Sequence, residues 1–219
     1  MEDSEQNELE PSELGTKEYW DNIYERDKNN FEDHGDVGEI WFGEDSELRI
    51  LRWLTKNNIP TDKRIIDLGC GNGMMLVELA REGYNNVTGV DYCESAIELS
   101  KSIIDTQSMG HIKLEVADLT QDCNLVGFDI VLDKGTFDAI SLSPDDPKSK
   151  KLMYLKNVSK MLNDGGLFVI TSCNWTENEL VEQFSTDFKH KQTIPTPTFS
   201  FGGKTGSVVS SVVFEKNAT

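Results

Sequence analysis

The chain has few cysteines and histidines, and those it has are scattered. Four cysteines and three histidines occur in 219 residues, without the paired spacing of metal sites or disulfide frameworks. We therefore expect no bound metal and no disulfide bonds. Long apolar runs are also absent. None approaches the roughly 18 residues that a membrane-spanning helix needs, so we expect no membrane partner.

An N-terminal secretory signal is missing as well. Residues 1–13 carry six acids and no base, whereas a signal begins with basic residues and continues into an apolar core. This composition predicts a disordered, solvated tail over residues 1–13. It also predicts a protein that stays inside the cell, in the cytoplasm and, as a second expected compartment, the nucleus.

Basic residues are outnumbered almost two to one. The chain has 21 lysines and arginines against 39 acids, a net charge of −18, and the six acids of the tail leave −12 on the rest. Such a surface repels a phosphate backbone, so nucleic acid is a disfavoured partner. A basic protein substrate suits it better, although acidity can also serve solubility alone.

Strand-like and helical patterns alternate from residue 64 onward, which predicts an α/β fold with a parallel sheet covered by helices on both faces. One helix is expected to end at a turn over residues 164–166. The last two strands have only a loop over residues 195–206 between them, so they should form an antiparallel hairpin. The predicted strands are residues 65–68, 87–91, 112–116, 128–132, 167–171, 188–193 and 208–214.

The length suits a single domain over residues 14–219. Within it, residues 14–63 form a predicted N-terminal helical cap, with two helices in residues 17–56 around a glycine-containing loop. No internal repeat indicates a second unit, and we expect a monomer.

A glycine turn follows the first predicted strand. Asp67 precedes Gly69, Gly71 and Gly73, so the strand runs into a turn with glycine at alternate positions. Glycine allows backbone angles that other residues disfavour and lets a nucleotide lie against bare backbone. The turn therefore predicts a nucleotide-type cofactor, although some glycine turns are only tight connections.

Acidic residues after the next two strands narrow the choice of cofactor. Asp91 lies 22 residues after Gly69, where a carboxylate accepts hydrogen bonds from ribose hydroxyls. Asp118 is placed to accept from an adenine amino group, or else only forms a turn. The dinucleotide fingerprint would need glycine at Met74, so NAD is disfavoured. S-adenosylmethionine carries a sulfonium and an amino group, which the acid Asp67 suits.

This combination of glycine turn, acids and helix-free terminal hairpin resembles the class I, seven-stranded, Rossmann-like methyltransferases, in which the last strand inserts antiparallel. A closer resemblance, over about residues 14–216, is to the eukaryotic lysine methyltransferases that modify translation elongation factor 1-alpha. It implies transfer of up to three methyl groups from S-adenosylmethionine to one lysine of that basic protein, leaving S-adenosylhomocysteine. The segments that carry it are GEIWFG (38–43), DKGTFDAI (133–140), TSCNW (171–175) and FSFGG (199–203).

Asp133 is the first choice to orient the acceptor amine, because it closes the fourth strand next to the point where the strand order reverses. A capping or loop role for this acid is the alternative. Phe137, Asn174 and Trp175 are expected to wall the lysine channel, with core packing as the alternative for the aromatic rings. Lys134 is predicted to be ion-paired rather than catalytic.

The remaining predicted cofactor residues adjoin these positions. Trp41 is expected either to close over the cofactor or to anchor a helix. Cys70 lies between two motif glycines without a histidine nearby, so a nucleophilic role is rejected. The predicted cofactor set is Trp41, Asp67, Gly69, Gly71, Asn72, Gly73, Asp91, Tyr92, Asp118, Leu119 and Asp133.

Three alternative functions stay open. The first is a methyltransferase that acts on another protein or on a small amine. The second is a nicotinamide dehydrogenase, and the third is a module that binds S-adenosylmethionine without catalysis.

Overall fold

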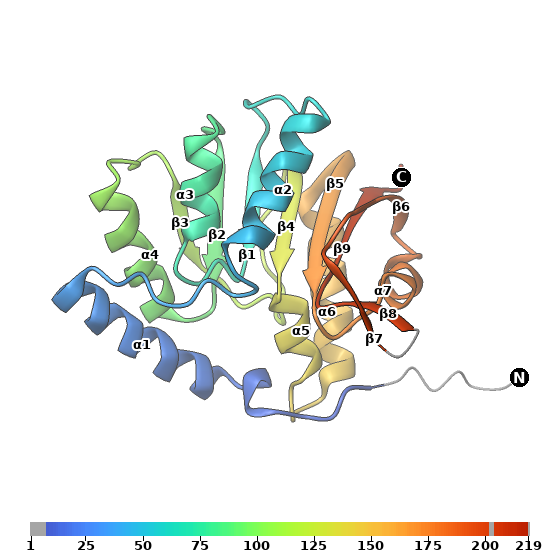
Figure 1. The fold of residues 1–219 in the computed structure, drawn as a ribbon, viewed down its shortest axis with the longest axis horizontal. Coiled ribbons are helices and arrows are strands. Elements are labelled where there is room, and N and C mark those ends of the chain that lie inside the picture. Colours follow the sequence, from blue (N-terminus) through green and yellow to red (C-terminus); the bar gives the residue numbers. More distant parts are fainter. Residues whose placement is uncertain (1–7, 202–203, 219) are drawn as a thin grey trace, which may run out of the picture.

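Seven strands form one mixed sheet at the centre of the molecule (Figure 1). The computed structural model describes residues 8–201 and 204–218. The order is β3-β2-β1-β4-β5-β9-β6, and β9 runs antiparallel to both of its neighbours. The predicted α/β sheet and its antiparallel terminal hairpin are thereby confirmed. The strands are β1 (Ile65–Leu68), β2 (Val87–Asp91), β3 (Lys113–Val116), β4 (Phe128–Lys134), β5 (Leu162–Ser172), β6 (Phe188–Ile194) and β9 (Ser210–Lys216).

In the described part of the chain, six helices cover the two faces of this sheet. One apolar cluster joins α2, α3 and α4 to one face, and a second cluster joins α5, α6 and α7 to the other. Because side chains alternate along a strand, Ile65 of β1 lies in the first cluster and Ile66 in the second. The helices are α2 (Glu44–Lys56), α3 (Met74–Arg81), α4 (Glu94–Thr106), α5 (Thr136–Ser141), α6 (Pro147–Met161) and α7 (Glu177–Phe184).

Helix α1 (Lys17–His34) runs across the carboxyl end of the sheet, below α3 and α4 in Figure 1. Its first turn is capped by Thr16, whose side chain accepts a hydrogen bond from Tyr19 N, and its end is closed by Gly35 in the left-handed conformation. The two helices predicted within residues 17–56 are therefore α1 and α2. The parallel strands end on the side of the sheet where α1 and α5 lie (Figure 1), which is the edge where ligands bind in open α/β sheets.

The first described residues are held against the body of the protein. Leu9 packs on the cluster beneath α5, α6 and α7, Glu8 pairs with Lys151 at 2.9 Å, and Ser12 N donates to Leu142 O at 3.0 Å. A short 3-10 helix, η1 (Glu13–Gly15), leads into α1. The predicted disorder of residues 1–13 is thus wrong for residues 8–13, because an apolar anchor and backbone pairing outweigh the acidic composition. Residues 1–7 lie outside the described residues.

Four further elements differ from the sequence prediction. Helix α5 occupies a stretch that showed no apolar period, and the strands β7 (Thr198–Phe201) and β8 (Lys204–Ser207) pair within the predicted loop. The helix expected to end at residues 164–166 is α6, which stops at Met161. The next residue, Leu162, already belongs to β5 and pairs with Phe128 of β4. No helix among the described residues is both long and apolar enough to cross a membrane.

Candidate cofactor and acceptor site

A cavity of about 530 Å³ opens where β1, β2, β3 and β4 end. This volume lies within the range of small-molecule sites. From β1 the chain first adds β2 and β3 on one side of the sheet and then crosses back to add β4 on the other side of β1. The cavity therefore lies where the strand order reverses. The predicted residues in its wall are Trp41, Gly69, Gly71, Asn72, Asp91, Tyr92, Asp118 and Leu119.

The glycine turn after β1 forms the floor of this cavity. Gly69, Gly71 and Gly73 have φ angles of 63°, 53° and 75°, a region that favours glycine. A Cβ on Gly69 would lie 2.1 Å from Thr136 Oγ1, and one on Gly71 would lie 2.5 Å from Tyr24 Oη. The turn therefore needs glycine to keep contact with its own neighbours, in addition to leaving room for a ligand.

Asp91 ends β2 beside the glycine turn. Its two oxygens accept from Gly71 N at 3.1 Å and Cys93 N at 2.9 Å, which fixes the carboxylate in the wall. Burial raises the pKa of Asp91 to about 6. A carboxylate has about four acceptor positions, so these two bonds leave acceptor capacity for ligand hydroxyls.

The loop after β3 forms the far wall. Thr120 donates through N and Oγ1 to Asp118 Oδ1, at 2.8 and 2.6 Å, so Oδ2 is left for a donor from the cavity. Asn157 of α6 donates to Leu119 O at 2.9 Å and fixes the loop against the body. These contacts give the predicted adenine side of the site a rigid frame.

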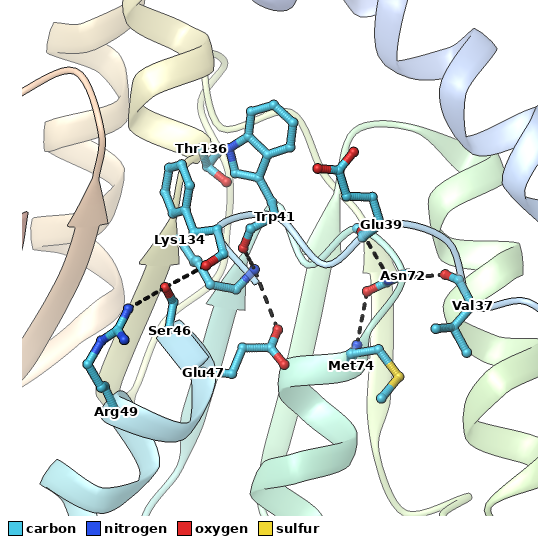
Figure 2. Close-up of polar contacts among 12 residues, drawn as sticks. Val37, Glu39, Trp41, Ser46, Glu47, Arg49, Asn72, Met74, Lys134 and Thr136 are labelled. Carbon is cyan, nitrogen blue, oxygen red and sulfur yellow. Dashed lines mark hydrogen bonds and ion pairs between the residues drawn. The ribbon is translucent and has the colours of Figure 1, made fainter. Parts of the chain in front are cut away.

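Asp67 lies behind the wall and not in it. It is only 3% exposed, it receives no hydrogen bond from the described residues, and burial raises its pKa to about 8. The positive charge of Lys134 opposes this rise in pKa, and Lys134 Nζ lies 3.5 Å from Glu47 Oε1 and donates to Trp41 O at 3.0 Å (Figure 2). Lys134 is thus ion-paired, as its position in the sequence predicted.

Residues 37–43, here called the strap, close one side of the cavity. Asn72 Nδ2 donates to Val37 O at 3.0 Å and to Glu39 O at 3.3 Å, while Lys134 holds Trp41 O (Figure 2). Asn72 and Lys134 follow β1 and end β4, so they hold the strap from both sides of the point where the strand order reverses. The sequence did not show this clamp, because its partners lie 33 to 93 residues apart.

Aromatic side chains from α1 and the strap line the same cavity. The Trp41 ring lies 5.3 Å from the Trp20 ring, edge to face, and Trp20 stacks on Tyr24 at 6.0 Å. A Cβ on Gly135 would lie 2.6 Å from Trp41 Cδ1, so the indole packs against the turn after β4. Trp20 and Tyr24 were not predicted. Their spacing of four residues, which places both on one face of α1, was the available signal.

Asp133 does not face the cavity. It is fully buried, and its carboxylate accepts from Thr136 N and Phe137 N at 3.0 Å and from Tyr154 Oη at 2.5 Å. Burial raises its pKa to about 7. The structure corrects the prediction that this acid orients the acceptor, because the side chain turns into the first turn of α5. Gly73, the last glycine of the turn, is also not among the described residues of the cavity wall.

The other predicted acceptor residues lie behind α5. Phe137 is fully buried and packs on the rings of Tyr154 and Phe184, and Trp175 Nε1 donates to Ser141 Oγ. Asn174 follows β5, with its N–H donating to Ser172 Oγ at 3.2 Å. None of the three is among the described residues of the cavity wall, which favours the packing alternative for both aromatic rings.

The antiparallel last strand beside β5 separates this sheet from the all-parallel nucleotide domains of dehydrogenases, so the architecture is that of the class I methyltransferases. The chain belongs to the methyltransferase-domain family, whose model matches residues 59–211. This membership decides against the dehydrogenase alternative.

Relatives resemble the chain over almost its whole length. EEF1A lysine methyltransferase 2 of Homo sapiens is 52% identical over 94% of this chain and 88% of its own. Protein-lysine N-methyltransferase EFM4 of Saccharomyces cerevisiae is 39% identical over 95% of this chain and 96% of its own.

Solved structures share the fold at low identity. The N-methyltransferase NodS of Bradyrhizobium japonicum, in complex with S-adenosyl-L-homocysteine, has a TM-score of 0.65 at 17% identity, covering 90% of this chain and 98% of its own. The [4+2]-cyclase SpnF has a TM-score of 0.69 at 12% identity, covering 96% and 99%. The fold therefore hosts more than one reaction, and the reaction has to be argued from the site.

Proposed function

We propose that this chain is a protein-lysine N-methyltransferase that transfers methyl groups from S-adenosylmethionine to a lysine of translation elongation factor 1-alpha. The observation that carries the proposal is identity of 39% to 52% over at least 94% of the chain with relatives named for lysine methylation. That similarity includes the N-terminal cap and the terminal strands, and so extends well beyond the glycine turn.

The cavity fits this cofactor in size and in polar groups. We assign Asp91 to the ribose hydroxyls, Asp118 to the adenine amino group, and Tyr92 and Leu119 to the sides of the base. The glycine turn and Asn72 lie under the amino-acid end, Trp41 closes the cavity above it, and Asp67 lies behind the wall at that end. These assignments rest on the Asp91 and Asp118 acceptor positions that the described contacts leave open.

When bound, S-adenosylmethionine supplies an activated methyl group: its carbon–sulfur bond breaks with the electron pair left on sulfur, as a lysine nitrogen that has lost a proton to water forms the new bond. A free lysine has a pKa of about 10.4, and burial beside a positive charge lowers that value. The chain's task is then to hold the amine in line and to exclude water.

We assign Asp133, Phe137, Asn174 and Trp175 to positioning α5. This helix lines the cavity through Ala139 and Ile140. Its start is tied by the Asp133 bonds, and its end by Ser141, which accepts from Trp175 Nε1 at 3.3 Å. A wall that is fixed at both ends keeps the acceptor channel in one shape.

We also propose that the chain acts as a monomer in the cytoplasm, where the elongation factor works, with the nucleus as a second compartment. The net charge of −18 favours a basic protein over nucleic acid as its partner.

Intact-mass analysis of elongation factor 1-alpha after incubation with enzyme and S-adenosylmethionine tests the proposal. We expect mass increases in steps of one methyl group, which also give the number of groups added. Labelling of only RNA or a small amine with radioactive methyl donor would contradict it. Binding of S-adenosylhomocysteine with no methyl transfer to any acceptor would instead support the non-catalytic alternative.

A further inference from the structure

The charged residues in the cavity wall are almost all paired. Each of the four cations faces an acid, and the distances are 2.6 Å for Lys17–Asp21, 2.7 Å for Arg26–Asp27, 3.5 Å for Lys134–Glu47 and 3.7 Å for Lys150–Asp145. Of the acids in the wall, Asp27 and Asp145 belong to these pairs, and Asp91 and Asp118 accept hydrogen bonds from their own loops.

Glu39 is the exception. It lies in the cavity wall and is exposed, and no hydrogen bond or ion pair among the described residues reaches its carboxylate. An exposed acid needs no partner in order to be stable. Its charge acts at longer range on Arg26, whose pKa it helps to raise, but no cation of the described residues pairs with it directly, so a cation coming from solvent can approach it at the rim.

The backbone around Glu39 is fixed. Asn72 binds the carbonyls of Val37 and Glu39, and Lys134 binds that of Trp41, so the strap is held on both sides of the Glu39 side chain. Gly38, with φ of 78°, packs so closely on α1 that a Cβ would lie 2.6 Å from Asp27 Oδ2. The acid is therefore presented from a rigid backbone.

Glu39 and Trp41 point to the same side of the strap, away from Asn72 and Glu47 (Figure 2). Trp41 meets Trp20 edge to face at 5.3 Å, and both indoles line the same cavity as Glu39. Aromatic faces attract ammonium groups, including methylated ones that can no longer donate every hydrogen bond. Carboxylate and indoles together form a receptor for an alkylammonium group.

We infer that Glu39 receives the ammonium group of the acceptor lysine at the rim of the cavity, beside the indoles of Trp41 and Trp20. The inference rests on the proposed function and adds the residue that recognises the acceptor. An exposed ion pair is weak in water, so it guides the ammonium without trapping its proton. The amine then loses that proton as it passes the indoles toward the sulfonium.

The test compares Glu39→Gln with Glu32→Gln, a matched control in which an exposed acid of α1 outside the described cavity wall is changed. We expect Glu39→Gln to raise the KM for elongation factor 1-alpha roughly two- to fivefold, with the affinity for S-adenosylhomocysteine unchanged by calorimetry. Glu39→Lys should raise the KM further. The difference from wild type should shrink with added salt, which a purely structural defect would not produce.

A different pattern would overturn the inference. If Glu39→Gln weakens S-adenosylhomocysteine binding and leaves the acceptor KM unchanged, the carboxylate binds the ammonium of the cofactor. If neither quantity changes, Glu39 has no recognition role. Absence of elongation-factor methylation by the wild-type enzyme, with S-adenosylhomocysteine still bound, would instead count against the proposed function.

Discussion

Asp91 and Asp133 lie at the carboxyl ends of β2 and β4, the two strands that flank β1, and they have much in common. Both are buried, at 4% and 0% exposed, both accept two backbone N–H groups, and burial raises the pKa of both, to about 6 and about 7. Asp91 nevertheless lies in the cavity wall, while Asp133 adds a third donor, Tyr154, and lies behind it. Access to the remaining lone pairs, and not burial or a raised pKa, separates the acid that we propose as ligand-binding from the one that we propose as structural.

The largest effect is expected on stability at Asp133. Asp133→Ala would leave Thr136 N, Phe137 N and Tyr154 Oη without their acceptor, at about 1 kcal/mol or more for each group. We expect the free energy of unfolding, measured in urea, to fall by about 3–5 kcal/mol. Tyr154→Phe removes only one donor and should cost about 1 kcal/mol. Unchanged stability with lost methyl transfer would restore the direct role that the sequence suggested.

The second effect is expected on binding at Asp91. Asp91→Asn keeps an oxygen for one backbone N–H but removes the charge that would face the ribose hydroxyls. A hydrogen bond to a charged group contributes about 1.5–3 kcal/mol, so the Kd for S-adenosylhomocysteine should rise by roughly 10- to 100-fold in calorimetry. Asp105→Asn, at an exposed position of α4, is the charge-matched control. A normal Kd in Asp91→Asn would mean that Asp91 is as structural as Asp133.

The third effect concerns pH. Burial raises the pKa of Asp133 to about 7 in the folded chain, whereas an unfolded aspartate has a pKa of about 3.9. The folded state therefore keeps a proton that the unfolded state loses, and this contribution to stability fades as pH rises from about 4 through 7. The stability advantage of wild type over Asp133→Asn should be greatest near pH 4–5. An advantage that grew with pH would contradict the raised pKa.

The sheet could be predicted because its strands carry their own signal. Ile65, Ile66 and Leu68 are fully buried in β1, and a continuous apolar run of that kind is typical of a central strand. The glycine turn after it was also predictable, because left-handed backbone angles leave a direct mark on the choice of residue.

The role of Asp133 and the strap could not be predicted, because both depend on partners far along the chain. The Asp133 carboxylate accepts a hydrogen bond from Tyr154, which is 21 residues away. The strap is held by Lys134, which is 93 residues from Trp41. Helix α5 is only six residues long and starts three residues after that acid, so its sequence shows no apolar period of its own. Local patterns do not encode such contacts.

The position of β9 has a consequence for synthesis of the protein. Residues 210–216 pair with both β5 and β6, so one half of the sheet stays open until these residues have left the ribosome. Until then the edges of β5 and β6 expose unpaired backbone groups, which favour association with other chains. A ribosome that stalls before residue 210 would therefore carry a nascent chain whose glycine turn is complete but whose sheet still needs chaperone protection.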